Sequence, residues 1–207
     1  MTLWSLYLPV NPKPKEPIKM QNYDFGRGEV PAHQHANGGG WVADTAVVEE
    51  TVFVGPDARV YESARVRGNA RILENGQVYG TARVYGNAHV YKSAVVHGNA
   101  RVYGTAKVWG RSQIYGHAQI YDDAVVFQDA KVYSNAEVFG CAEIYGKAEV
   151  YGATQTYQDA NIYGNAEVYG NALVYGNAEV YGAARVYGFA KVSGWDRVEK
   201  NVFMSDV

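Results

Sequence analysis

Residues 166–183 read Ala166-Glu-Val-Tyr-Gly-Asn, Ala172-Leu-Val-Tyr-Gly-Asn, Ala178-Glu-Val-Tyr-Gly-Ala, and this six-residue phrase decides the fold. It runs without insertion from about Gly40 to Phe203, as roughly twenty-seven hexads. We number the positions of a hexad slots one to six. Slot one is small, slot three is branched, slot four is mostly aromatic, and slots five and six are mostly Gly-Asn or a polar pair. A fixed period of this kind indicates a repeat architecture.

Each hexad predicts a four-residue strand followed by a two-residue corner. Slots one and three alternate with slots two and four, so Ala and Val point inward while the variable residue and the Tyr point outward. Gly at slot five tolerates positive φ and Asn is the next most tolerant residue, so slots five and six turn the chain. Three hexads make a triangular coil of about eighteen residues. About nine coils at roughly 4.8 Å spacing give a prism about 43 Å long.

The predicted interior is too small to hold a ligand. Val packed against Ala fills a narrow triangle and leaves it dry. Function is therefore expected on the three outer faces, at the ends, or between subunits.

The repeat resembles the left-handed parallel β-helix of hexapeptide-repeat proteins. The closer match is the YdcK-type β-solenoid repeat, because Gly39-Gly40-Trp41-Val42 precedes the series of Ala-x-Val-Tyr-Gly-Asn hexads. The resemblance implies an all-β, single-stranded, left-handed solenoid. It implies little about function: such proteins are labelled transferases by analogy, and similar repeats are common in phage-encoded proteins.

Composition divides the chain into three parts. Residues 1–38 hold five of the six prolines and are expected to form an N-terminal arm or cap, with a short edge strand at Trp4–Leu8 and an extended linker over residues 11–17. Residues 39–192 form the hexapeptide-repeat β-helix. The phrase decays after Val192, so residues 193–207 are expected to cap the C-terminal end.

Bulk properties exclude several classes of function. A net charge of −2 gives no global attraction to duplex nucleic acid or to a membrane. The single cysteine, Cys141, excludes an internal disulfide. No apolar run is long enough to span a membrane, and Met1–Val10 lacks the basic start and cleavage site of a signal peptide. We expect a cytoplasmic protein, in the bacterial host cytoplasm if it is phage-encoded, and no cofactor.

The aromatic residues of slot four are expected to stack into ladders on three faces, because every third hexad lies on the same face. Ladders of this kind hold strand register, and a ring at the end of a ladder is also free to stack on a ligand or partner. Face one carries Arg67, Tyr85, Tyr103, Tyr121, Phe139, Tyr157 and Tyr175. Face two carries Leu73, Tyr91, Trp109, Phe127, Tyr145, Tyr163 and Tyr181. Face three carries Tyr61, Tyr79, His97, Tyr115, Tyr133, Tyr151, Tyr169 and Tyr187.

Slot two segregates charge along the column. It is basic in the first coils and turns acidic from Glu137 to Glu179. On face one Arg65, Arg83 and Arg101 are predicted to stack, which costs stability because like charges oppose one another. Either solvent and salt screen this surface, or an anionic partner offsets the repulsion. The predicted ligand site, for an anion such as a nucleotide or sugar phosphate, consists of Arg65, Arg83, Arg101, Tyr85 and Tyr103. The acidic region of a second subunit, aligned antiparallel, is an alternative partner.

Face three has little charge in its first half and is a candidate for self-association. The interface residues that we predict are Tyr79, Val95, His97, Tyr115 and Tyr133. The alternative is an exposed face without a partner.

Evidence for catalysis is weak, and we assign no catalytic or metal-binding residue. His97 and His117, on adjacent coils of face three, are the best candidates for a base or a metal ligand, and His33 and His35 lie in the arm. No long loop, phosphate-binding Gly motif or nucleophile elbow is present. The sequence favours a non-enzymatic, oligomeric structural or sequestering protein. The alternatives are a hexapeptide-type acyltransferase acting at a subunit interface and a rigid spacer or fibre component of a phage particle.

Overall fold

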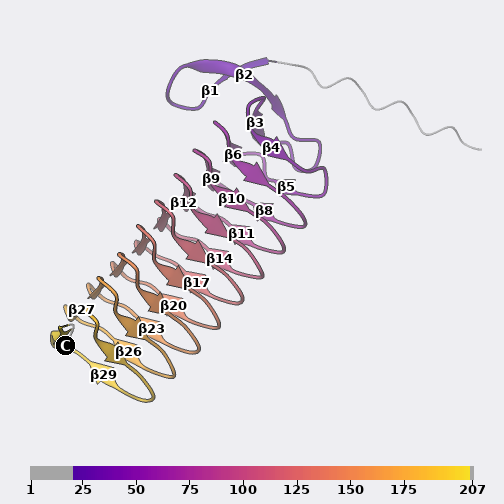
Figure 1. The fold of residues 1–207 in the computed structure, drawn as a ribbon. Helices are drawn as coiled ribbons and strands as arrows, with labels where there is room; N and C mark the ends of the chain where they lie inside the picture. The colour runs from indigo at the N-terminus through magenta and orange to yellow at the C-terminus, as the bar shows by residue number, and fades with distance from the viewer. Residues whose placement is uncertain (1–20, 206–207) are drawn as a thin grey trace, which may run out of the picture.

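The computed structural model describes residues 21–205 as a column of stacked coils (Figure 1). Every regular element in this range is a β-strand. The predicted edge strand at Trp4–Leu8 and the Pro-rich linker at residues 11–17 lie outside the described residues. None of the residues described here forms a helix of the length and apolar character needed to cross a membrane.

Three sheets run along the column, one for each face. Face one is a nine-stranded sheet: β4 Val47–Val48, β7 Arg65–Val66, β10 Arg83–Val84, β13 Arg101–Val102, β16 Gln119–Ile120, β19 Glu137–Val138, β22 Gln155–Thr156, β25 Leu173–Val174 and β28 Lys191–Val192. Face two is also nine-stranded: β5 Phe53–Val54, β8 Arg71–Ile72, β11 His89–Val90, β14 Lys107–Val108, β17 Val125–Val126, β20 Glu143–Ile144, β23 Asn161–Ile162, β26 Glu179–Val180 and β29 Arg197–Val198. Face three is twelve-stranded: β1 Gln21–Asp24, β2 Glu29–Gln34, β3 Trp41–Ala43, β6 Arg59–Val60, β9 Gln77–Val78, β12 Val95–Val96, β15 Gln113–Ile114, β18 Lys131–Val132, β21 Glu149–Val150, β24 Glu167–Val168, β27 Arg185–Gly188 and β30 Val202–Met204.

From β3 to β29 the register between paired strands follows the predicted coil of eighteen residues, whereas β1 and β2 pair antiparallel and β30 pairs with β27 at a separation of sixteen residues. On face one, for example, Arg65 pairs with Arg83 and Arg83 with Arg101 in parallel strands. The prediction of a parallel β-solenoid of about nine coils is therefore confirmed. Its left-handed sense of winding stays a prediction from the family resemblance.

Most strands have two residues, where the hexad pattern predicts four. Regular pairing is confined to slots two and three, because slot five adopts positive φ and turns the chain. Hydrogen bonds nevertheless continue into the corners: the Arg67 N–H donates to the Val84 carbonyl over 3.0 Å, and the Asn69 N–H donates to the Gly86 carbonyl over 2.8 Å. Adjacent coils are therefore joined around most of their perimeter.

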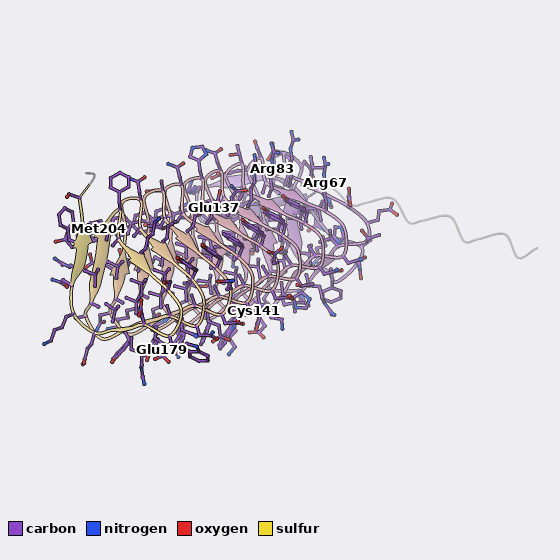
Figure 2. The ribbon with its side chains drawn as sticks, turned by 60° about the horizontal axis from the view of Figure 1, so that its bottom comes forward. Arg67, Arg83, Glu137, Cys141, Glu179 and Met204 are labelled. Atoms are coloured by element: carbon purple, nitrogen blue, oxygen red, sulfur yellow. The ribbon has the colours of Figure 1, made fainter. Side chains whose placement is uncertain are left out.

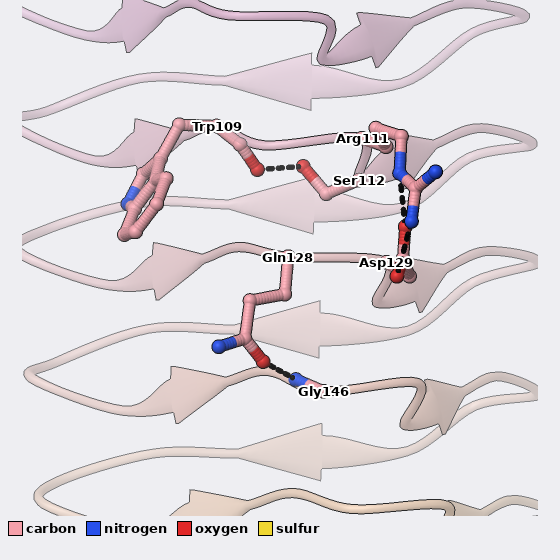
Figure 3. A network of polar contacts seen from close by, with 6 residues as sticks. All are labelled: Trp109, Arg111, Ser112, Gln128, Asp129 and Gly146. Atoms are coloured by element: carbon pink, nitrogen blue, oxygen red, sulfur yellow. Dashed lines mark hydrogen bonds and ion pairs between the residues drawn. The ribbon is translucent and has the colours of Figure 1, made fainter.

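The interior is the predicted column of small and branched side chains. Slots one and three are fully buried along the repeat, as in Ala88 and Val90, which are 0 % exposed. Two threonines interrupt this core, Thr154 and Thr156, and their hydroxyls have no hydrogen-bond partner. The Ser112 hydroxyl, which is also buried, donates to the Trp109 carbonyl over 2.9 Å (Figure 3).

The corners depend on a left-handed residue at slot five. Within residues 21–205, seven residues other than glycine adopt this conformation, among them Glu62 at φ 57° and Lys92 at φ 58°. Where slot five is Gly140, an added Cβ would lie 2.8 Å from the backbone nitrogen of Gln158 in the next coil, so the close stacking of coils favours glycine there.

The N-terminal end of the column is covered by a hairpin. Strands β1 and β2 pair antiparallel, and β2 pairs antiparallel with β3 of the first coil. The connection passes close to that coil, since a Cβ on Gly38 would lie 2.3 Å from the Val54 carbonyl oxygen. At the opposite end β30 pairs with β27, and Val198 and Val202 pack against the core.

Candidate anion-binding site

Three arginines form a row on face one. Arg65, Arg83 and Arg101 occupy slot two of β7, β10 and β13, and the parallel register places each directly beside the next. Neighbouring strands lie about 4.8 Å apart, so the row spans roughly 10 Å along the column. All three side chains are exposed. Like charges opposite one another across strands destabilise a sheet, so the free protein carries a local electrostatic cost here.

A surface hollow of about 350 Å³ lies on this row. Its lining consists of Arg65, Arg67, Arg83, Tyr85 and Arg101. Figure 2 shows Arg67 and Arg83 projecting from the same side of the column. The hollow thus joins four guanidinium groups to one aromatic ring, and Arg67 is a member that our sequence prediction did not include.

No carboxylate among the described residues forms an ion pair with Arg65, Arg83 or Arg101. In the later coils three cations of slot two meet a carboxylate one coil away. The pairs are Lys131–Glu149 at 2.9 Å, Arg185–Glu167 at 3.2 Å and Arg197–Glu179 at 3.1 Å. Figure 3 shows a corner example, in which the Arg111 guanidinium contacts Asp129 at 2.7 Å.

The three arginines have no carboxylate opposite them because the strands on either side of the row carry neutral residues in slot two. Val47 precedes Arg65, and Gln119 follows Arg101. The next carboxylate, Glu137, lies one coil beyond Gln119. It accepts hydrogen bonds from the amides of Gln119 at 3.3 Å and Gln155 at 3.2 Å.

The aromatic ladder of face one begins at Tyr85. Tyr85 stacks on Tyr103 with a centroid distance of 4.8 Å, and Tyr103 stacks on Tyr121 at 4.9 Å. Burial raises the pKa of Tyr103, and it raises that of Tyr121 to about 12, with Glu137 contributing to both. Tyr103 is covered on both ring faces and is not part of the hollow lining, although the sequence grouped it with Tyr85.

A second hollow borders the other side of the arginine row, at the corner between faces three and one. It has a volume of about 720 Å³, and Arg83 and Arg101 are common to both hollows. The remaining lining residues are Thr81, Asn99, His117, Gln119, Asn135 and Glu137. Most of these are neutral hydrogen-bonding groups. In the sequence, the polar residues of slot six that lie beside the slot-two arginines could have indicated these lining residues.

The residues predicted to mediate self-association lie together along face three. Val95 pairs in register with Gln77 and Gln113, and His97 stacks between Tyr79 at 4.9 Å and Tyr115 at 5.1 Å. Further along the same ladder, Tyr115 stacks on Tyr133 at 4.8 Å.

The histidines do not form a metal centre. Among the residues that the structure describes, no group of three His, Cys, Asp or Glu side chains could hold a metal ion. His97 is part of the face-three ladder, whereas His117 lines the corner hollow. Burial, aided by the positive charge of Arg27, lowers the pKa of His97. His33 in the hairpin instead contacts Asp44 at 2.8 Å.

The stacked coils and their pairing by eighteen residues define the chain as a β-solenoid repeat protein. Residues 82–98, 118–134 and 166–182 match the model of the YdcK beta solenoid repeat. Arg83 and Tyr85 lie within the first of these stretches. No curated protein matches the chain.

Proposed function

We propose that this protein is a binding protein that holds a small anionic ligand on the arginine row of face one. The observation that carries the proposal is the stack of Arg65, Arg83 and Arg101, which has no carboxylate partner among residues 21–205 and lines a hollow. A phosphate or carboxylate group in this hollow accepts charge-assisted hydrogen bonds from neighbouring guanidinium groups. It also offsets their mutual repulsion.

The test is calorimetric titration of the full chain with inorganic pyrophosphate. Replacing Arg83 by Gln removes the central charge of the row, and we expect affinity to fall about 10- to 100-fold, the range for a hydrogen bond between charged groups. Arg185→Gln is the matched control, because Arg185 occupies the same slot but is paired with Glu167. We expect it to change affinity less than about twofold. Absence of pyrophosphate binding at millimolar concentration would overturn the proposal, as would equal losses in both variants.

A second candidate function is self-association through face three. It is supported by the neutral slot-two row of Gln77, Val95 and Gln113, at the height where faces one and two carry cations. A flat neutral surface next to a stacked ladder suits contact with a second copy.

The solution mass of the native protein, compared with that of Val95→Lys, tests the second candidate. We expect a dimer or larger assembly that Val95→Lys dissociates, since a charge in the centre of such a contact is unpaired. A monomeric native protein would remove this candidate and leave the anion site unaffected.

A further inference from the structure

The first rings of the aromatic ladders on face three and face one have different surroundings. On face three the ladder ends at Tyr61, because the preceding coil has Ala43 in slot four. Phe25, which follows β1 and lies outside the repeat, stacks on Tyr61 at 4.9 Å and 20°. A ring from elsewhere in the chain thus completes this ladder. Phe25 is buried, being 7 % exposed.

On face one the ladder has a comparable gap, which no ring of residues 21–205 fills. Arg67 occupies the slot-four position before Tyr85, and among the described residues Tyr85 stacks on Tyr103 alone. The Arg67 Nε lies 3.9 Å from Glu49 Oε1 of the preceding coil, and among the described residues Arg67 makes no cation–π contact with Tyr85. The outer face of Tyr85 therefore opens into the hollow with the four arginines.

We infer that the planar ring of the ligand takes this missing place in the ladder, so that the anion held by the arginine row is a nucleotide. Its base stacks on the open face of Tyr85, and its phosphate contacts Arg65, Arg83 and Arg101. This inference rests on the proposed function and specifies the chemical class of the ligand.

The spacing of the site fits this class of ligand. Tyr85 and Arg83 lie two residues apart on one extended strand and point to the same side, which separates their origins by about 6–7 Å. A nucleotide carries its base and its phosphate on one ribose, at a comparable separation. Aromatic side chains bind every base through its π-face, so the site selects a nucleotide over a sugar phosphate and does not select one base strongly.

Titrations with AMP and with ribose 5-phosphate test the inference, because the two ligands carry one phosphate each and differ by the base. We expect AMP to bind about tenfold or more tightly, as stacking of a base on an aromatic side chain predicts. Tyr85→Leu should bring the affinity for AMP down to that for ribose 5-phosphate. Arg185→Gln, which lies outside the hollow, should leave the affinities for both ligands within about twofold.

A second pair of variants fills the gap or leaves it open. Arg67→Tyr extends the ladder by one ring, so it should abolish the preference for AMP; Arg67→Gln removes the same charge without adding a ring and should keep the preference. Equal binding of AMP and ribose 5-phosphate to the native protein would overturn the stacking inference and leave the anion site standing. A preference for AMP that remains in the Tyr85→Leu variant would also overturn the stacking inference. Failure of both ligands, with pyrophosphate also unbound, would overturn the anion site itself.

Discussion

The first coils of the solenoid and its later coils share a core but differ in how they treat positive charge. In the later coils Lys131, Arg185 and Arg197 each contact a carboxylate one coil away. In the part of the chain that the structure describes, Arg65, Arg83 and Arg101 stack on one another without such a partner. Apart from Thr154 and Thr156, slots one and three hold small and branched side chains in both regions, so the core does not account for this difference. Our proposal of a binding surface on the first coils rests on this difference.

The largest expected effect tests whether the core is indeed equivalent in the two regions. Ile72 and Ile162 occupy slot three of the same sheet, one in each region, and both are 0 % exposed. Ile72→Ala and Ile162→Ala should each lower the free energy of unfolding by about 2–4 kcal/mol, through lost burial and a residual cavity. Urea unfolding measures both values. Costs that differ several-fold would show that the regions differ in their cores as well as on their surfaces.

A smaller effect concerns two polar side chains, Thr154 and Thr156, that lie in the described core without hydrogen-bond partners. The Thr156 hydroxyl is buried and unpaired, between Val138 and Val174 in the register. Thr156→Val removes the unsatisfied group at similar volume and should raise the free energy of unfolding by about 1–2 kcal/mol. Ser112→Ala, which removes a hydroxyl that donates to Trp109, should give no gain. Urea unfolding of both variants decides this, and a loss of stability in Thr156→Val would contradict the expectation.

Reversing one charge in each region tests whether the first and the later coils differ in electrostatic repulsion. Arg83→Glu places a carboxylate between Arg65 and Arg101, so it should stabilise the ligand-free protein by about 0.2–1 kcal/mol for each new opposite-charge pair. Glu149→Lys places two lysines opposite one another and should destabilise by a similar amount, since it breaks the contact with Lys131. Thermal unfolding at low salt shows both shifts. A destabilised Arg83→Glu protein would mean that the row is not under repulsion.

The smallest expected effect is a dependence on pH in the first coils. Burial lowers the pKa of His89, and the neighbouring charges of Arg71 and Lys107 lower it further. The unfolded chain, whose histidine keeps its ordinary pKa near 6.5, then binds more protons than the folded chain below that pH. Stability should therefore fall as the pH decreases through about 6.5.

His89→Gln tests this assignment and should flatten the fall in part. His97, whose pKa is lowered mainly by burial, should account for a remainder. Unfolding midpoints measured between pH 5 and pH 8 give the comparison. A native protein whose stability is flat across this range, or rises towards low pH, would contradict the expectation.

The sequence predicted the solenoid because its period is local and unbroken. The order of residues in each hexad predicts which side chains point inward, so the burial of residues such as Ala88 and Val90 follows from spacing alone. The row of Arg65, Arg83 and Arg101 followed in the same way, since eighteen residues separate successive members. The predicted strands were too long, because the pattern does not show where the left-handed residue of slot five ends regular pairing.

What the sequence did not predict depends on contacts outside the period. Phe25 belongs to no hexad, and its stacking on Tyr61 follows from the hairpin of β1 and β2. The role of Arg67 in the hollow could have been noticed, because it interrupts the aromatic series of slot four. The direction of its side chain, towards Glu49, required the structure. For the same reason Tyr103 was grouped with Tyr85, although only Tyr85 has a free ring face.

The most direct measurement of the central claim is a titration of the arginine side-chain Nε–Hε resonances with inorganic pyrophosphate, followed by nuclear magnetic resonance. The account predicts saturable shifts of Arg65, Arg83 and Arg101, with a common affinity, while Arg111 and Arg185, which are paired with carboxylates, stay unchanged. Small and uniform shifts across all arginines, or none, would contradict it.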